Sequence, residues 1–150
     1  MANISTTLCG VAGEYFVAAE LSRRGYIASI TLRNTKGVDI LASNENASHQ
    51  VMIQVKSNQG NSREWILTQK AEDDFQDNLF YVFVNLKTDL ERPEYFIVPS
   101  KDVADFVREG HARWLKEPGR HGQPHKDSNV RKFQVNDERY LESWFMLGLG

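Results

Sequence analysis

An acidic residue inside an apolar stretch is the first sign of chemistry in this sequence of 150 residues. Asp39 stands between Val38 and Ile40 in a short segment that is otherwise mostly apolar. An ionised carboxylate in such a place is costly unless it reaches solvent, a cation or a metal. Gln54 and Lys56 lie two residues apart in the next predicted strand and therefore share one of its faces. Three polar side chains are thus expected to converge at one edge of a sheet.

Glu14 adds a fourth polar side chain. It lies in a predicted helix whose neighbouring residues, 10–13 and 15–19, give little sign of a face that contacts water. Simpler interpretations exist for all these residues. Asp39 and Lys56 would form a cross-strand salt bridge, and Glu14 would be a helix residue that reaches solvent.

The elements that must position these residues begin with a helix from Leu8 to Arg24. Ser5, Thr6 or Thr7 can cap its start, and Gly25 follows the basic end. Apolar residues recur at three- and four-residue spacing, which puts them on one face of this helix. These residues are Leu8, Val11, Ala12, Tyr15 and Ala19.

Short apolar or alternating segments predict the strands of a sheet. They cover residues 26–32, 38–42, 50–57, 80–84 and 95–98. Further helices are predicted at residues 68–77 and 101–109, and near the C-terminus around residues 141–148. The order of helix, three strands, helix, further strands and helix predicts an α/β (α+β) fold, with a mixed central sheet flanked by helices.

Composition places the chain among ordinary globular proteins. The sequence is 41% hydrophobic and 25% charged, which predicts a single domain over residues 1–150. No apolar segment approaches the roughly 20 residues that span a bilayer. The start of the chain lacks the pattern of a secretory signal and Cys9 is the only cysteine, so we expect a reducing, cytoplasmic location.

Charge is distributed unevenly around a net value of -2. Residues 63–110 hold eleven Asp or Glu against six Lys or Arg. Residues 111–132 instead hold six Lys or Arg against two acids, with three histidines among them. This segment could bind a polyanion, but on charge alone a solvated loop rich in Gly and Pro is the favoured interpretation.

Other candidates give weaker signals. His121 and His125 are close in sequence, but Gly122 and Pro124 between them are incompatible with a helical metal-binding pair. Cys9 is interpreted as a small packed residue. Trp65 is interpreted as a core or edge residue that could alternatively stack on an unpaired base.

Three short motifs resemble those of the PD-(D/E)xK nucleases, in particular the archaeal Holliday-junction resolvases and the Mrr-like restriction enzymes. They are Gly13-Glu14 on the first helix, Gly37-Val38-Asp39 before the second strand and Gln54-Val55-Lys56 in the third. Gln54 stands where most members have an acid, as in the Mrr-like variant. The resemblance covers about residues 10–86 and implies a restriction endonuclease-like core. The rest is then a C-terminal extension with the basic loop 111–132 and a terminal helix.

The resemblance also implies an activity, namely hydrolysis of DNA phosphodiester bonds with Mg²⁺ or Mn²⁺, in repair, recombination or defence. Glu14, Asp39, Gln54 and the carbonyl of Val55 would hold the metal, and Lys56 would orient or activate the attacking water. Further residues are candidates for contact with nucleic acid. They are Lys36, Ser57, Asn58, Arg120, Lys126, Arg131 and Lys132.

Two other functions remain open at this stage. Gln54 removes one charge from the metal site, so the fold could be catalytically degenerate and serve as a nucleic-acid or protein binding module. Alternatively, the acidic segment 63–110 indicates an interaction protein that does not bind DNA. A homodimer would let such a domain engage both strands of a duplex, but the sequence identifies no interface.

Overall fold

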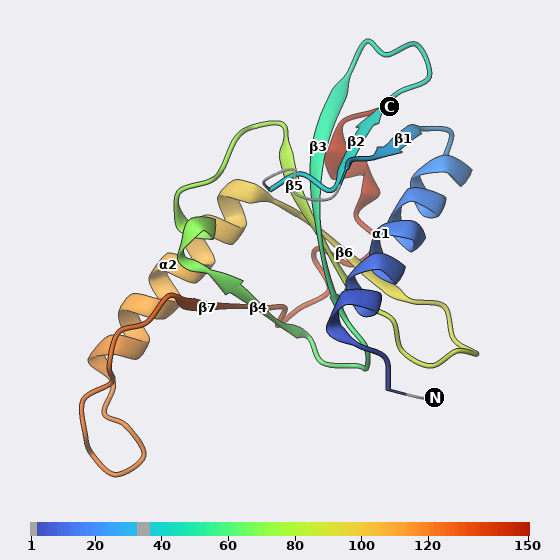
Figure 1. Ribbon diagram of the computed structural model, residues 1–150. Coiled ribbons are helices and arrows are strands. Elements are labelled where there is room, and N and C mark those ends of the chain that lie inside the picture. Colours follow the sequence, from blue (N-terminus) through green and yellow to red (C-terminus); the bar gives the residue numbers. More distant parts are fainter. Residues whose placement is uncertain (1–2, 33–36) are drawn as a thin grey trace.

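The fold is built on a mixed five-stranded sheet, seen in the computed structural model, which describes residues 3–32 and 37–150 (Figure 1). The strands lie in the order β1-β2-β3-β5-β6. β3 and β5 are parallel, and the other neighbouring pairs are antiparallel. The strands are β1 (Ile27–Ile30), β2 (Ile40–Ser43), β3 (Gln50–Asn58), β5 (Leu79–Asn85) and β6 (Glu94–Pro99). The predicted α+β class with a mixed central sheet is confirmed.

Different elements cover the two faces of this sheet (Figure 1). α1 (Thr6–Arg23) packs on one face. α2 (Ser100–Lys116) covers the other, together with a ribbon of β4 (Glu64–Thr68) and β7 (Val130–Gln134). All seven residues of β5 are buried, as predicted for a central strand that is covered on both sides. Among the described residues, no helix is long and apolar enough to cross a membrane.

The first helix was predicted correctly, but its buried face was not. Ser5 caps α1, since its hydroxyl accepts a hydrogen bond from the N–H of Leu8 at 3.2 Å. Leu8 and Tyr15 face outward, with 57% and 65% of their surface exposed. Because α1 carries apolar residues on more than one face, spacing alone could not select the packed one. The buried residues are Cys9, Gly13, Val17, Glu20 and Leu21.

The prediction of a helix at residues 68–77 was wrong. Residues 64–68 form strand β4, and only a 3-10 turn, η1 (Gln69–Glu72), follows. Trp65 and Leu67 are buried on one side of β4, and Trp65 pairs with Phe133 of β7. This partner lies far away in the sequence, so the local pattern did not reveal the strand.

The C-terminal third also differs from expectation. α2 continues through Gly110 to Lys116, because a single glycine costs a helix only about 1 kcal/mol. β7 replaces part of the predicted basic loop. In place of the predicted terminal helix there is a 3-10 turn, η2 (Trp144–Leu147). Its residues Trp144 and Leu147 are nevertheless buried in the core, as the apolar stripe predicted.

Candidate active site

Asp39 lies where β2 separates from β3, one residue before the first residue of β2. Its backbone N–H donates to the carbonyl of Ile53 at 2.8 Å, which extends the antiparallel ladder by one bond. Its carboxylate oxygen Oδ2 then accepts the N–H of Val55 at 2.7 Å. The side chain therefore accepts the hydrogen bond that the backbone of a longer β2 would accept. It is fixed at the edge of β3 that β2 leaves unpaired, here called the open edge of β3.

β3 arranges the triplet as the sequence predicted. Ile53 and Val55 are buried in the core below α1, whereas Gln54 and Lys56 are half-buried on the opposite face. The carbonyl of a strand residue points to the same edge as its N–H. Since the N–H of Val55 points to Asp39, its carbonyl oxygen also lies on the edge where Asp39 stands.

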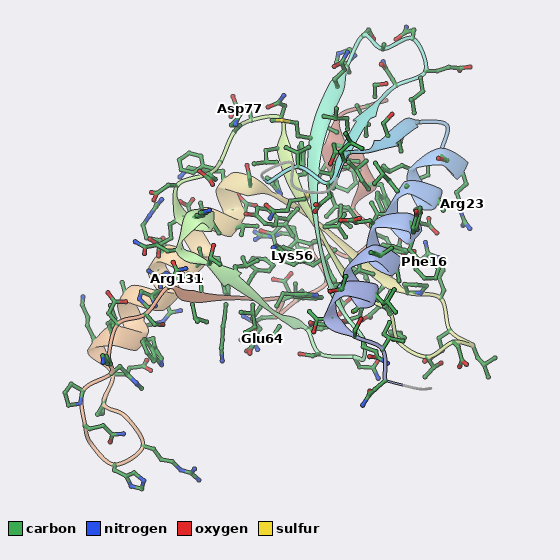
Figure 2. All side chains as sticks on the ribbon, viewed as in Figure 1. Phe16, Arg23, Lys56, Glu64, Asp77 and Arg131 are labelled. Carbon is green, nitrogen blue, oxygen red and sulfur yellow. The ribbon has the colours of Figure 1, made fainter. Side chains whose placement is uncertain are left out.

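Gln54 and Lys56 line a cleft of about 710 Å³, here called the β3 cleft. Tyr81 of β5, in register with Gln54, continues the floor. Residues 67–76, from the end of β4 through η1 and the four residues after it, form much of the remaining wall. Figure 2 shows Lys56 near the middle of the molecule, between α1 and the β4 side.

The simplest alternative for Asp39 and Lys56, a cross-strand salt bridge, is not formed. Both residues are described, and no ion pair joins them within 4.0 Å. Asp39 is bound to the backbone of Val55, while Lys56 lines the β3 cleft. Because Lys56 is half-buried at the cleft and does not pair with Asp39, its ammonium is available to a ligand.

Glu14 reaches the sheet through a close contact of α1. A Cβ atom on Gly13 would lie 1.7 Å from the hydroxyl oxygen of Ser57, so the helix approaches β3 as closely as glycine allows. Glu14 follows directly and is half-buried. Since α1 packs on the face of the sheet that buries Ile53 and Val55, Glu14 approaches β3 from the side opposite to Gln54 and Lys56.

Ser57 and Asn58 both contact other elements of the protein. The hydroxyl oxygen of Ser57 is buried beneath α1 and has no hydrogen-bond partner among the residues that the structure describes. The amide of Asn58 donates to the carbonyl of Glu64 at 2.6 Å, which ties β3 to the start of β4. The structure thus shows them shaping the loop after the triplet.

The oxygen donors at this edge suit a hard divalent cation. Asp39 offers a carboxylate fixed by one hydrogen bond, Gln54 an amide oxygen and Val55 a carbonyl, and Mg²⁺ prefers such oxygen ligands. In the part of the chain that the structure describes, no group of three or more His, Cys, Asp or Glu side chains could hold a metal ion. The donor set therefore depends on amide and carbonyl oxygens as well as on carboxylates.

The candidates for nucleic-acid contact lie in different environments. Lys36 falls outside the described residues. Arg120 and Lys126 are exposed on the loop after α2, and the side chain of Lys132 is 61% exposed while it pairs with Glu64. Arg131 contradicts the expectation of a phosphate contact, because its guanidinium is buried and pairs with Glu72 at 2.6 Å.

Sequence reasoning missed two other residues of the β3 cleft, Tyr81 in its floor and Lys70 in its wall. Tyr81 is almost fully buried, and burial, with the nearby charge of Asp74, raises its pKa to about 12. The apolar segment that contains Tyr81 predicted only a strand, and Lys70 lies in the segment that was wrongly predicted as a helix.

Two weaker candidates have structural roles. Cys9 is buried in the core, as predicted, and burial raises the pKa of its thiol. Trp65 is 1% exposed and its indole N–H donates to the carbonyl of Val84 at 3.2 Å, so it is a core residue and not a base-stacking one.

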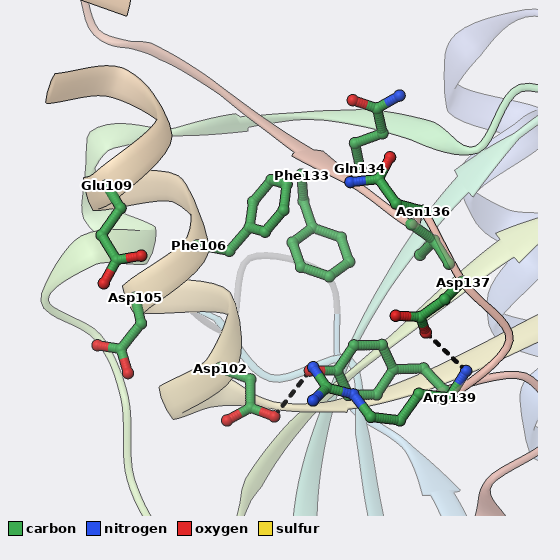
Figure 3. A pocket seen from close by; sticks show the side chains of 11 residues that line it. Asp102, Asp105, Phe106, Glu109, Phe133, Gln134, Asn136, Asp137 and Arg139 are labelled. Carbon is green, nitrogen blue, oxygen red and sulfur yellow. Dashed lines mark hydrogen bonds between the residues drawn. The ribbon is translucent and has the colours of Figure 1, made fainter. Parts of the chain in front are cut away.

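A second cavity, of about 290 Å³, lies between α2 and the segment after β7 (Figure 3). Asp102, Asp105 and Glu109 line it from α2. The hydroxyl of Tyr140 donates to Asp102 at 2.9 Å, and burial, together with this carboxylate, raises the pKa of Tyr140 to about 12. This acidic wall is unsuited to a polyanion.

The fold is restriction endonuclease-like, as the comparisons with known proteins show. The structure is similar to a bacterial homing endonuclease, I-Ssp6803I, with a TM-score of 0.54 and 15% identity over 96% of this chain and 92% of the other. It also matches Hjc, a Holliday junction resolvase from Archaeoglobus fulgidus, with a TM-score of 0.48 and 14% identity over 83% of each chain. No family model and no curated protein sequence matches the chain.

Proposed function

We propose that this protein is a divalent-metal-dependent endonuclease that hydrolyses DNA phosphodiester bonds. The observation that carries the proposal is the arrangement of Asp39 and Lys56. The carboxylate of Asp39 is fixed at the open edge of β3 by the N–H of Val55, and Lys56 lies in the adjoining cleft without pairing with it. A structural salt bridge would leave neither group available, whereas this arrangement leaves both for a phosphate and its cation.

Each residue has a separate task in the proposed site. Asp39, Gln54 and the Val55 carbonyl would hold the cation, with Glu14 contributing a second carboxylate from α1. A bound divalent cation supplies charge neutralisation at the phosphate and lowers the pKa of water. Lys56 donates hydrogen bonds that orient the attacking water, and its fixed positive charge stabilises the charge that develops on the phosphate.

DNA is the proposed substrate for two reasons. The similar structure with the higher TM-score is that of a homing endonuclease. The β3 cleft, moreover, is open and lined by polar groups from two elements, as a polymeric substrate requires. Repair, recombination and defence are all compatible with this chemistry.

Gln54 determines the second candidate function. An amide oxygen binds Mg²⁺ less strongly than a carboxylate does, so this site holds the cation more weakly than one with three acids. If the loss of charge has removed catalysis, the protein is a nucleic-acid or protein binding module with a nuclease fold. Binding of DNA that needs no metal and survives loss of the Asp39 carboxylate would identify that function.

A cleavage assay tests the proposed function. Purified protein is incubated with labelled duplex, single-stranded and four-way DNA in Mg²⁺, Mn²⁺ or EDTA, next to Asp39→Asn and, as a matched control, Asp89→Asn on an exposed loop. We expect cleavage that requires the cation, is reduced roughly a hundredfold or more by Asp39→Asn and is unchanged in the control. Cleavage that persists in EDTA, or in Asp39→Asn at the wild-type rate, would refute the proposal.

A further inference from the structure

The chain between α2 and β7, residues 117–129, projects from the body of the protein and is here called the finger (Figure 1). Internal hydrogen bonds give its tip a defined turn. The N–H of Gly119 donates to the carbonyl of Gln123 at 2.6 Å, and the N–H of Gly122 donates to the carbonyl of Gly119 at 2.9 Å. Gly122 has a φ of +80°, which favours glycine, so the sequence suits this turn.

Stacked rings fix the finger to the end of α2. The ring of His125 lies 4.0 Å from that of Trp114, centroid to centroid, and His111 lies on the α2 side at 5.5 Å from Trp114. His111 Nε2 contacts Asp127 at 2.8 Å, and this hydrogen bond holds the pKa of Asp127 below its ordinary value. Both contacts come from the chain after the tip and hold this side of the finger against the end of α2.

The positive charges of this region are not neutralised within the protein. Arg113, Lys116, Arg120 and Lys126 lie between the end of α2 and the finger, against Glu117 and Asp127 as the two acids in residues 113–129, and Asp127 contacts His111. None of these four cations forms an ion pair with any part of the chain that the structure describes. Elsewhere, cations such as Arg63, which pairs with Glu94 at 3.1 Å, are satisfied internally.

The rest of the protein does not attract a polyanion. The net charge is -2, and eleven acids against six cations lie in residues 63–110. In the β3 cleft, Lys56 and Lys70 are balanced by Asp73 and Asp74. Because sequence-independent affinity for DNA comes from cations that contact phosphates, the cleft cannot supply it alone.

The finger is fixed relative to the cleft by the ribbon at its base. The N–H of Gln69, at the start of η1, donates to the carbonyl of Asn129 at 3.0 Å. β7 continues from the finger and pairs with β4, whose end lines the β3 cleft. A polymer held by the finger is therefore held at a set distance from Lys56.

We propose that the finger binds the phosphate backbone of duplex DNA and is the main source of the protein's affinity for it. Arg120 and Lys126 contact phosphates, and Arg113 and Lys116 extend the positive surface along α2. The inference rests on the proposed function only in taking DNA as the partner. It assigns affinity to one element and hydrolysis to another, and the two assignments are tested separately.

Binding without cleavage provides the test. Fluorescence anisotropy with a labelled duplex of about 30 base pairs is measured in EDTA at several salt concentrations, for the wild type and for Arg120→Gln/Lys126→Gln. The matched control is Arg23→Gln/Lys101→Gln, which removes two exposed cations that pair locally with Glu20 and Asp105. Circular dichroism confirms that each variant is folded.

We expect the finger variant to bind roughly tenfold or more weakly near 0.1 M salt. We also expect the slope of log affinity against log salt to fall by about 1.8, since each lost phosphate contact removes about 0.9. The control should stay within about twofold of the wild type. Equal affinity and slope in the finger variant and the wild type overturn the inference, whatever the cleavage assay shows. Tighter binding of duplex RNA than of duplex DNA also overturns it.

Discussion

The Asp39 carboxylate has two roles, because it supports the fold as well as the proposed chemistry. Its Oδ2 atom is the acceptor for the N–H of Val55 in the edge of β3. A buried donor that loses its acceptor costs about 1–3 kcal/mol. Substitutions at this position must therefore be chosen so that stability and activity are separated.

Asp39→Ala is expected to lower the free energy of unfolding by about 1–3 kcal/mol, because the N–H of Val55 loses its partner. Asp39→Asn keeps an oxygen acceptor and is expected to cost less than about 1 kcal/mol. Urea unfolding of both variants at pH 7 measures the difference. Equal stability of the two variants would show that this hydrogen bond does not support the strand edge.

The sequence predicted where the candidate residues lie better than it predicted their surroundings. Strand alternation predicted that Gln54 and Lys56 share one face of β3, and an acid in an apolar segment indicated that Asp39 needs a polar partner. Tyr81 was not predictable as part of the cleft, since nothing local distinguishes it from its buried neighbours. Arg131 was assigned to DNA because its neighbours are basic, but burial and Glu72 decide its role.

At the scale of elements, Gly13 sets how closely α1 approaches β3. Gly13→Ala would place a Cβ atom 1.7 Å from the hydroxyl oxygen and 2.9 Å from the Cβ of Ser57. We expect this variant to lose about 1–3 kcal/mol in the free energy of unfolding. Adding Ser57→Gly should recover part of the loss, and chemical unfolding of both variants measures it. A Gly13→Ala variant as stable as the wild type would refute the close contact.

Ion pairs join the C-terminal segment to α1 and to the loop before β6. Glu142 pairs with Arg92 and, at 3.3 Å, with Arg24, and it accepts the indole N–H of Trp144 at 2.6 Å. Arg92 also pairs with Glu20 of α1 at 3.0 Å. Burial raises the pKa of Glu142, but the hydrogen bonds from Arg92 and Trp144 outweigh it and leave the pKa lowered.

A carboxyl whose pKa is lowered in the folded state stabilises the protein at neutral pH, and this contribution is lost as pH falls through the folded pKa. We therefore expect stability to decrease below about pH 4.5, with a smaller decrease in Glu142→Gln than in the wild type. The exposed Glu45→Gln serves as control. Urea unfolding at pH 7 and pH 3.5 measures the dependence, and equal losses in Glu142→Gln and the wild type would contradict it.

Elements defined by local pattern were predictable, and those defined by distant partners were not. β3 and β5 carry their alternation or apolar run within themselves, and the structure has them where the sequence predicts. β4 is stabilised through Trp65 and its register with Phe133 of β7. That pairing joins two segments more than sixty residues apart, which a local pattern does not contain.

For the whole molecule, the outer face of α1 predicts a homodimer. Leu8, Tyr15 and Phe16 are 57%, 65% and 44% exposed, and apolar patches of this kind mark interaction sites. A second copy would let two sites engage both strands if the proposed DNA substrate is a duplex. Sedimentation equilibrium should give about twice 17.2 kDa for the wild type. Tyr15→Glu should be monomeric and the exposed control Leu90→Glu dimeric, and a monomeric wild type would contradict the expectation.

The central claim is that Asp39 and Lys56 form a working site at the edge of β3. Its most direct test is the single-turnover rate of DNA cleavage in Mg²⁺ at saturating protein, for Lys56→Gln and for Lys101→Gln, a control lysine on α2 outside the β3 cleft. The account predicts a loss of roughly a hundredfold or more for Lys56→Gln, with unchanged DNA binding, and a wild-type rate for Lys101→Gln. A Lys56→Gln protein that cleaves as fast as the wild type would contradict it.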